Sequence, residues 1–126
     1  MSNSTTFLID SYLAAYGESD KTTRSEVVRG IWAEDGQLVD PPLTAQGHTQ
    51  IIDQADALLS QFPGHRFMRS SGIDTHHGWS RYGWQLLDTA GQVALEGCDF
   101  AQVDDNGKLT QVVGFFGPLP MHEKTF

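Results

Sequence analysis

The chain has 126 residues, a mass of 13.9 kDa and a formal net charge of −8, a length that builds one hydrophobic core rather than two. Sixteen acidic residues against eight basic ones argue against a nucleic-acid backbone or an anionic membrane as partner. Cys98 is the single cysteine, so an internal disulfide is excluded and we expect a reducing, cytoplasmic location. We expect no membrane span, because no apolar run approaches about 20 residues, and no secretory signal, because residues 1–6 lack its charged and apolar regions.

The first half of the chain has a helical pattern. Apolar residues recur at four-residue spacing between Ser4 and Gly17, which predicts a first helix. The capping-box sequence at 23–26 predicts a second helix that ends by Gly36. A short strand at 37–40 follows, ended by two prolines, and a third helix runs from after Gly47 to about Gln61.

The second half has a strand pattern interrupted by turns. The predicted strands span roughly 65–75, 79–88, 92–103 and 108–117. Helices followed by a meander predict an α+β fold in which helices cover one face of a curved antiparallel sheet. The last strand is apolar on both alternating faces, so we expect a symmetric homodimer through the sheet. An edge strand with a few exposed apolar residues is the alternative.

Asp40 is the sharpest candidate for chemistry. It ends the short strand, follows two apolar residues and is held by Pro41 and Pro42. A carboxylate at the mouth of an apolar pocket is poorly solvated when ionised and is therefore a better base. The alternative is that an aspartate before two prolines simply begins a turn.

Aromatic residues supply the other candidates. Tyr12 lies on the inward stripe of the first helix, where its phenol could donate a hydrogen bond to a carbonyl oxygen that gains charge. It could equally be a core aromatic. The same two interpretations, pocket lining or plain core, apply to Trp32, Tyr82, Trp84 and Phe116.

The histidines do not form a metal site in this pattern. His76 and His77 are adjacent in a strand and point to opposite faces, so they cannot chelate one ion. His48 and His65 flank the third helix and could approach a pocket, although a polar surface role is simpler. Cys98 lies within a predicted strand, and this position favours a small buried hydrophobic residue over a nucleophile. We expect no metal and no cofactor.

Three segments together resemble the nuclear transport factor 2-like superfamily, which includes ketosteroid isomerase and the SnoaL-like polyketide cyclases. Residues 12–20, beginning Tyr12-Leu13-Ala14-Ala15, resemble the first helix of the isomerase. Residues 31–41 resemble the segment that leads to its general base, and 107–117 resemble the last hairpin and strand. The likeness covers the chain to about Pro118, which gives one SnoaL-like domain, 1–126, with its core at about 5–118 and a tail at 119–126.

The resemblance implies a cone-shaped sheet wrapped by helices around a deep apolar pocket. Asp40 falls where the isomerase has its base and Tyr12 where it has its oxyanion donor; the isomerase is a standard example of this chemistry. The second donor of the isomerase is a protonated acid on the third strand of the meander. Either Cys98 or Asp99 takes that place here, and a one-residue shift in register decides which side chain faces the pocket.

These observations predict a small-molecule-pocket protein that performs general-base proton transfer, of the isomerase or cyclase type, on an apolar carbonyl-bearing substrate. A non-catalytic binder of a small hydrophobic ligand and a dimeric interaction module are the alternatives. The interaction module predicts a cavity filled by aromatic side chains. The predicted catalytic residues are Asp40, Tyr12 and Asp99, and the predicted pocket residues are Trp32, His65, Tyr82, Trp84, Cys98 and Phe116.

Overall fold

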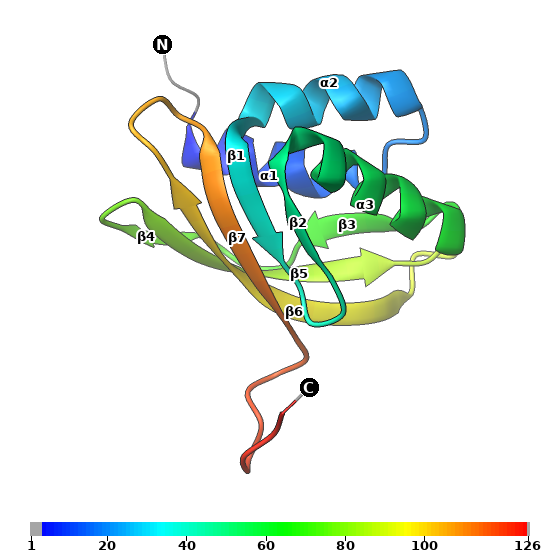
Figure 1. Ribbon diagram of the computed structural model, residues 1–126. Helices are drawn as coiled ribbons and strands as arrows, with labels where there is room; N and C mark the ends of the chain where they lie inside the picture. The colour runs from blue at the N-terminus through cyan, green and yellow to red at the C-terminus, as the bar shows by residue number, and fades with distance from the viewer. Residues whose placement is uncertain (1–3, 126) are drawn as a thin grey trace.

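The computed structural model describes residues 4–125, in which three helices cover one face of a seven-stranded curved sheet (Figure 1). The helices are α1 (Thr5–Ala15), α2 (Lys21–Ile31) and α3 (Gly47–Gln61). The strands are β1 (Trp32–Val39), β2 (Thr44–Gln46), β3 (Arg66–Arg69), β4 (Asp74–His76), β5 (Trp79–Leu87), β6 (Val93–Val103) and β7 (Leu109–Phe116). The predicted fold class, an α+β fold with helices wrapped around a curved sheet, is confirmed.

The sheet is mixed rather than wholly antiparallel. Its strand order is β2-β1-β7-β6-β5-β3, and β4 also pairs with β5. The pairs within the meander are antiparallel, but β1 and β7 are parallel. The parallel pair arises because the chain leaves β1 through the β2 hairpin and α3, and the meander then returns β7 to the side of β1. β1 thus lies beside β7 in the sheet, and Asp40 directly follows the end of β1.

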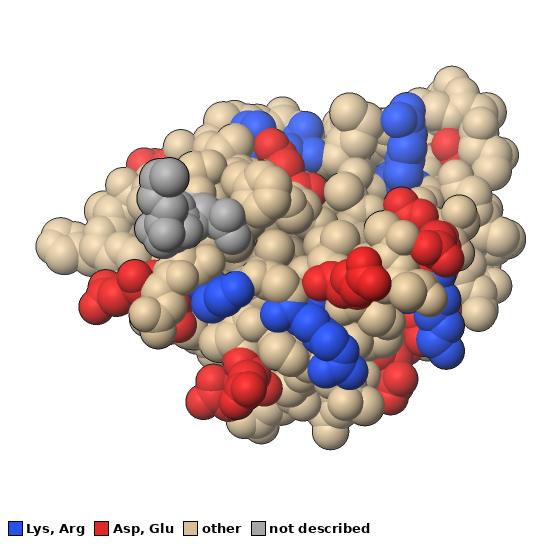
Figure 2. Space-filling model, turned by 90° about the horizontal axis from the view of Figure 1, so that it is seen from above, with Lys and Arg blue, Asp and Glu red and all other residues tan. Residues whose placement is uncertain are grey.

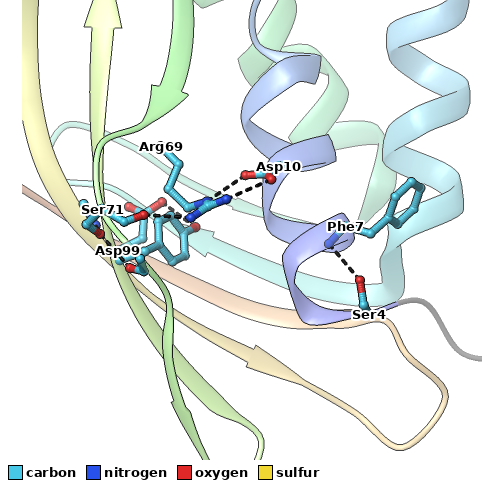
Figure 3. A network of polar contacts seen from close by, with 9 residues as sticks. Ser4, Phe7, Asp10, Arg69, Ser71 and Asp99 are labelled. Carbon is cyan, nitrogen blue, oxygen red and sulfur yellow. Dashed lines mark hydrogen bonds and ion pairs between the residues drawn. The ribbon is translucent and has the colours of Figure 1, made fainter.

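α1 lies across the concave face of the sheet, with a side-chain cap at its N-terminus and an ion pair to β3. Its N-cap is Ser4, whose hydroxyl accepts a hydrogen bond from the Phe7 amide at 3.1 Å. Arg69 on β3 donates to both carboxylate oxygens of Asp10 on α1, at 2.8 and 3.2 Å (Figure 3). A bidentate pair of this kind fixes orientation as well as position. The inward face of α1, which carries Tyr12, is therefore held toward the sheet.

The boundaries of the second helix differ from the prediction. α2 begins at Lys21 rather than at Thr23, because Asp20 is its N-cap and accepts hydrogen bonds from the Thr23 amide and hydroxyl. It ends at Ile31, five residues before Gly36, since Trp32 is already extended and pairs with Leu109 of β7. Tertiary pairing thus overrides the helical pattern at this point.

Two strands also differ from the prediction. The single strand expected at 65–75 is two strands, β3 and β4, which both pair with β5. Between them, the Ser70 amide donates to the Gly83 carbonyl, and the Ser71 hydroxyl accepts from the Gly83 amide. Serine side chains that bond to the backbone compete with a regular ladder. β2 was not predicted, because three residues after two prolines carry too little pattern to identify.

The helical layer is joined by a largely buried ion pair. The side chain of Arg24 on α2 is 7% exposed, and its Nη2 atom lies 2.5 Å from Oδ1 of Asp56 on α3. Arg24 also donates to the Glu18 carbonyl. Lys21, whose side chain is exposed, lies nearby, with its Nζ atom 3.5 Å from Oδ2 of Asp56. Basic side chains also lie beside acidic ones over the face shown in Figure 2. The buried pair fixes α2 against α3.

Replacing Asp56 by alanine leaves the buried guanidinium of Arg24 without its counter-charge. We expect the Asp56→Ala variant to lose about 2–3 kcal/mol of unfolding free energy, measured by urea titration. The matched control is Lys21→Ala, which removes the exposed partner of the same carboxylate and is expected to cost less than about 0.5 kcal/mol. Equal losses in the two variants would contradict this account of the pair.

The outer face of the sheet carries exposed aromatic residues. Phe100 on β6 is 39% exposed and Phe115 on β7 is 54% exposed, and their ring centroids are 6.0 Å apart. Within the described part of the chain, no helix is long and apolar enough to cross a membrane.

The homodimer through the sheet stays a prediction. If it forms there, the Phe115→Lys substitution places a charge in the interface and shifts sedimentation velocity from a dimer to a monomer. The control is Phe7→Lys, which changes an equally exposed phenylalanine on α1 and should leave the dimer intact. A wild-type protein that sediments as a monomer at high concentration would contradict the prediction.

Candidate active site

A cavity of about 360 Å³ lies between the helices and the concave face of the sheet. Helices α1 and α3 form two of its walls, and strands β3, β5, β6 and β7 form the third. Its lining is mainly apolar, with two carboxyl groups and two phenols. It is lined by Tyr12, Leu13, Tyr16, Asp40, Pro42, Leu43, Gln54, Ala57, Leu58, Gln61, Phe62, Phe67, Trp84, Leu86, Leu95, Asp99 and Phe116. The interaction-module alternative predicted a cavity filled by aromatic side chains, whereas this cavity is open.

Asp40 is held on this wall by a rigid hairpin. It follows β1 directly, and its backbone amide donates to the Leu43 carbonyl at 2.9 Å while the Leu43 amide donates back at 3.2 Å. Pro41 and Pro42 occupy the two positions between them, where each proline fixes its own φ. Gln54 on α3 donates from Nε2 to Asp40 Oδ2 at 3.3 Å. The carboxyl group is thus positioned by its backbone and by one side chain.

Asp99 reaches the same cavity from the middle of β6. The register pairs Asp99 with Tyr82 on β5 and with Gly114 on β7, so all three residues face the helices. The Tyr82 hydroxyl donates to Oδ2 at 2.8 Å, and Trp84 Nε1 donates to Oδ1 at 2.9 Å. Figure 3 shows Asp99 on the sheet, in the network that also contains Arg69 and Ser71. Both carboxylate oxygens therefore already accept a hydrogen bond from the protein.

Gly114 allows the two carboxyl groups to approach each other. A Cβ atom at position 114 would clash with Oδ1 of Asp40 and would stand 3.0 Å from Oδ1 of Asp99. The two acids therefore flank the same point of β7, which must lack a side chain. Glycine is the residue that permits so close an approach.

Burial makes both carboxyl groups weaker acids. Desolvation raises the pKa of Asp40 to about 6. For Asp99, desolvation is again the largest cause, the charge of Asp40 adds to it, and hydrogen bonds from Tyr82 and Trp84 oppose it, so the pKa is raised to about 7. Near neutral pH the pair therefore tends to keep one proton, and Asp40 is the group that ionises first.

The phenols of the cavity stay neutral. Burial, followed by the charge of neighbouring groups, raises the pKa values of Tyr12 and Tyr16 well above the usual value. A neutral phenol is a hydrogen-bond donor, and a buried one loses no donor strength to bulk water. The cavity thus contains an ionisable base and phenolic donors in an apolar setting.

The structure places five of the predicted site residues on the cavity wall: Tyr12, Asp40, Trp84, Asp99 and Phe116. The choice between Cys98 and Asp99 is decided by the register, which turns Asp99 inward. Trp32 and Tyr82 do not line the cavity but support it from behind. Trp32 packs its ring edge-on to Tyr12 at 5.8 Å, and Tyr82 is the buried donor to Asp99.

Two predicted pocket residues lie elsewhere. Cys98 pairs with Gly83 and Phe115 and points to the outer face of the sheet, because neighbouring strand residues alternate. It is therefore not among the residues that line the cavity with Asp40, but it lines a second hollow with Phe100 and Phe115. His65 is also outside the cavity lining: its Nδ1 lies 3.2 Å from the Pro63 carbonyl oxygen in the turn after α3.

The sequence patterns missed two polar residues of the site. Tyr16 lies one helical turn after Tyr12 and lines the cavity with it. The four-residue spacing placed both on one face, but it did not distinguish a site phenol from a core ring. Gln54 belongs to the polar face of α3 in the sequence, and only the fold brings it to Asp40. Within residues 4–125, no three potential metal-ligating side chains gather into a cluster.

The comparisons with known proteins agree with this architecture. No family model and no curated protein matches the sequence. Among solved structures, a candidate isomerase of the SnoaL-like family from Agrobacterium tumefaciens is 31% identical, with a TM-score of 0.85 over 90% of this chain and 97% of that one.

Two more distant structures share the fold. A protein with a ketosteroid isomerase-like fold from Catenulispora acidiphila, solved with trimethylamine, is 12% identical, with a TM-score of 0.70 over 89% of this chain and 86% of that one. A candidate polyketide cyclase from Sinorhizobium meliloti is 13% identical, with a TM-score of 0.67 over 86% of this chain and 94% of that one. The fold, the cavity and the identity to the Agrobacterium protein together establish that this chain belongs to the SnoaL-like family of the nuclear transport factor 2-like superfamily.

Proposed function

We propose that this protein is an enzyme of the isomerase or cyclase type, in which Asp40 acts as a general base on an apolar substrate that bears a carbonyl group. The observation that carries the proposal is the position of Asp40. Its carboxyl group lies in an apolar cavity, its pKa is raised to about 6, and a stiff hairpin and Gln54 hold it. A base with a pKa near the working pH transfers protons efficiently in both directions.

The proton-transfer step uses the ionised form of Asp40. The carboxylate removes a proton from the carbon next to the carbonyl group, and the electron pair of that C–H bond moves into the carbonyl group to give an enolate. Return of the proton to a different carbon isomerises the substrate. Attack of the enolate carbon on a second carbonyl carbon within the same molecule closes a ring instead: the π electrons of that carbonyl move to its oxygen, and the proton held by Asp40 returns to the alkoxide. Asp40 therefore serves either outcome, and the shape of the substrate decides between them.

Tyr12 is the group proposed to stabilise the enolate oxygen. Its phenol lines the same cavity, and its raised pKa keeps it protonated. A donor held in place before the reaction stabilises developing charge without a cost of reorganisation. Asp99 is proposed to assist from the same cavity wall, since the proton that it retains near neutral pH reduces the negative charge beside the enolate.

The lining also limits the class of substrate. None of the residues that line the cavity is a lysine, arginine or histidine. A carboxylate or phosphate on the substrate would therefore meet two aspartates without a compensating cation. The proposed substrate is neutral and mainly apolar, such as a cyclic ketone, a steroid ketone or an uncharged polyketide.

The Asp40→Asn variant tests the base directly. Exchange of the α-hydrogens of cyclohexanone, 2-tetralone and a steroid ketone for deuterium can be followed by NMR in D₂O. With the wild type, exchange of at least one bound ketone should exceed the buffer rate, and Asp40→Asn should reduce that excess by about 100-fold or more while it retains binding. The excess should also rise with pH through about 6, as Asp40 ionises.

The control is Gln61→Leu, which changes a polar lining residue at the C-terminal end of α3 and should retain the exchange. Unchanged exchange in Asp40→Asn would contradict the base. Failure of the wild type to bind any of the three ketones would contradict the carbonyl substrate.

The buried base should also reduce stability at high pH. Its folded pKa of about 6 lies above the usual value of about 3.9 for an unfolded chain. The folded protein then binds more protons than the unfolded one between about pH 4 and 6, so this contribution to stability is lost as the pH rises through that window. Asparagine has no charge to bury. We therefore expect Asp40→Asn to be more stable than the wild type by about 2 kcal/mol at pH 8, and by much less at pH 4.5.

Urea titration of both proteins at the two pH values measures this difference. The Asp53→Asn variant is a suitable control, because Asp53 is an exposed acid on α3, so the substitution removes a solvated charge instead of a buried one. A stability difference between Asp40→Asn and the wild type that is the same at pH 4.5 and pH 8 would contradict the burial of a raised-pKa carboxyl group.

A second candidate function is the binding of a small amine without catalysis. Two carboxyl groups and several aromatic rings, with no basic side chain in the lining, suit an ammonium ion. The Catenulispora protein of the same fold was solved with trimethylamine. An amine ligand predicts affinity that increases as the pH rises through about 6 to 7, where Asp40 and Asp99 ionise. Titration with trimethylamine at pH 5 and pH 8 by calorimetry distinguishes this function from ketone binding, which needs no charge on the ligand.

A further inference from the structure

The hydroxyl group of Tyr16 is buried and has no hydrogen-bond partner among the described residues. The residue is 5% exposed and lines the cavity. A buried hydroxyl without a partner destabilises the folded protein, and such groups in native structures are rare enough to need a physical reason. An acceptor on a ligand in the cavity would supply the missing partner.

Neighbouring polar groups of the site do not share this property. Tyr82 and Trp84 donate to Asp99, and Gln54 donates to Asp40. The indole N–H of Trp32 is also without a partner in the described chain, but Trp32 is not part of the cavity lining. Tyr16 therefore combines an unpartnered donor with a place on the cavity wall.

The ring of Tyr16 is fixed in place by its neighbours. It packs edge-on against Tyr12, with centroids 5.3 Å apart, and edge-on against Phe67 on β3, at 5.7 Å. The helix that carries it is held to β3 by the pair between Asp10 and Arg69 (Figure 3). Because the ring cannot turn toward solvent without loss of both contacts, the hydroxyl is a donor whose position is set before a ligand arrives.

Tyr16 also lies beside Tyr12, with the two ring centroids 5.3 Å apart. The Tyr12 phenol opposes the rise in the pKa of Tyr16 that burial and the charges of Asp40 and Asp99 cause, although no hydrogen bond of normal geometry joins the two hydroxyls. Tyr12 lies in the last turn of α1 and Tyr16 is the C-cap of that helix, so the two residues follow each other by one turn.

We infer that the Tyr16 hydroxyl is a second hydrogen-bond donor to the oxygen of the ligand, so that Tyr12 and Tyr16 together bind a carbonyl, enolate or phenol oxygen. The inference rests on the proposed function in one respect, the oxygen-bearing ligand. Asp99 lines the same cavity, and its carboxyl oxygens accept hydrogen bonds from Tyr82 and Trp84. The inference assigns the two donor positions to the phenols of Tyr12 and Tyr16, while the proton on Asp99 reduces the negative charge beside the ligand oxygen.

The Tyr16→Phe variant tests the inference first without any ligand. Phenylalanine keeps the ring and removes only the unpartnered hydroxyl, so thermal unfolding should occur at the same temperature as in the wild type or a higher one. The matched control is Tyr82→Phe, which removes a hydroxyl that donates to Asp99 and should lower the unfolding temperature. If Tyr16→Phe lowers it as much as Tyr82→Phe does, the hydroxyl has a partner within the protein and the inference is overturned.

The second measurement compares two ligands with the same skeleton. 2-Tetralone carries a carbonyl oxygen, whereas tetralin has none, and the dissociation constants of both are measured by calorimetry. Tyr16→Phe should weaken the binding of 2-tetralone by about tenfold, the effect of one lost hydrogen bond in a dry site. The affinity for tetralin, which offers no acceptor, should not change. An unchanged affinity for 2-tetralone would overturn the assignment of Tyr16.

The outcomes separate this inference from the proposed function. If Tyr16→Phe binds 2-tetralone as well as the wild type while Asp40→Asn loses the hydrogen exchange, the base stands and the second donor is wrong. If Tyr16→Phe loses affinity while the exchange does not depend on Asp40, the second donor stands and the base is wrong. If the wild type binds 2-tetralone no better than tetralin, the oxygen-bearing ligand and the Tyr16 inference are both overturned.

Discussion

Two aspartates share one side of an apolar cavity, and no basic side chain among the lining residues neutralises them. Isolated carboxylates in such a setting are costly, so the pair holds a proton and both pKa values rise. Several features of the fold serve this arrangement. Gly114 leaves room between the acids. Gln54 and a hairpin with two prolines orient Asp40, and one phenol and one indole donate hydrogen bonds to Asp99. A protein that keeps such a pair sacrifices stability for a carboxyl group that is basic near neutral pH.

Much of the fold was predictable because its signals are local. Ser4 and Gly47 mark helix starts, and the glycine turns that separate the last strands require only local backbone geometry. The errors occurred where a distant partner decided the structure. Trp32 is extended because Leu109, 77 positions later in the chain, pairs with it, and the strand expected at 65–75 divides where Ser71 bonds to Gly83. The parallel pairing of β1 with β7 likewise depends on the path of the whole chain and has no local signature.

The candidate site was predictable where a residue occupies a distinctive position, as Asp40 does before two prolines and Tyr12 does on an inward helix stripe. The place of Asp99 could not be derived, because one residue of register exchanges it with Cys98 and the register is set by pairing across three strands. Tyr16 and Gln54 were missed for a different reason. A tyrosine on an apolar stripe and a glutamine on a polar helix face look like ordinary structural residues until the cavity between them is seen.

The most direct measurement of the central claim is an NMR titration of the aspartate side-chain carboxyl carbons between pH 4 and pH 9, with Asp40→Asn and Asp99→Asn used to assign the two signals. It needs no ligand and reports the buried pair itself. The account predicts that Asp40 and Asp99 titrate as a coupled pair with apparent pKa values of about 6 and about 7. It also predicts that the loss of the Asp40 carboxyl group lowers the pKa of Asp99, because a like charge has been removed. Titration of both groups near the ordinary value of about 4 would contradict it.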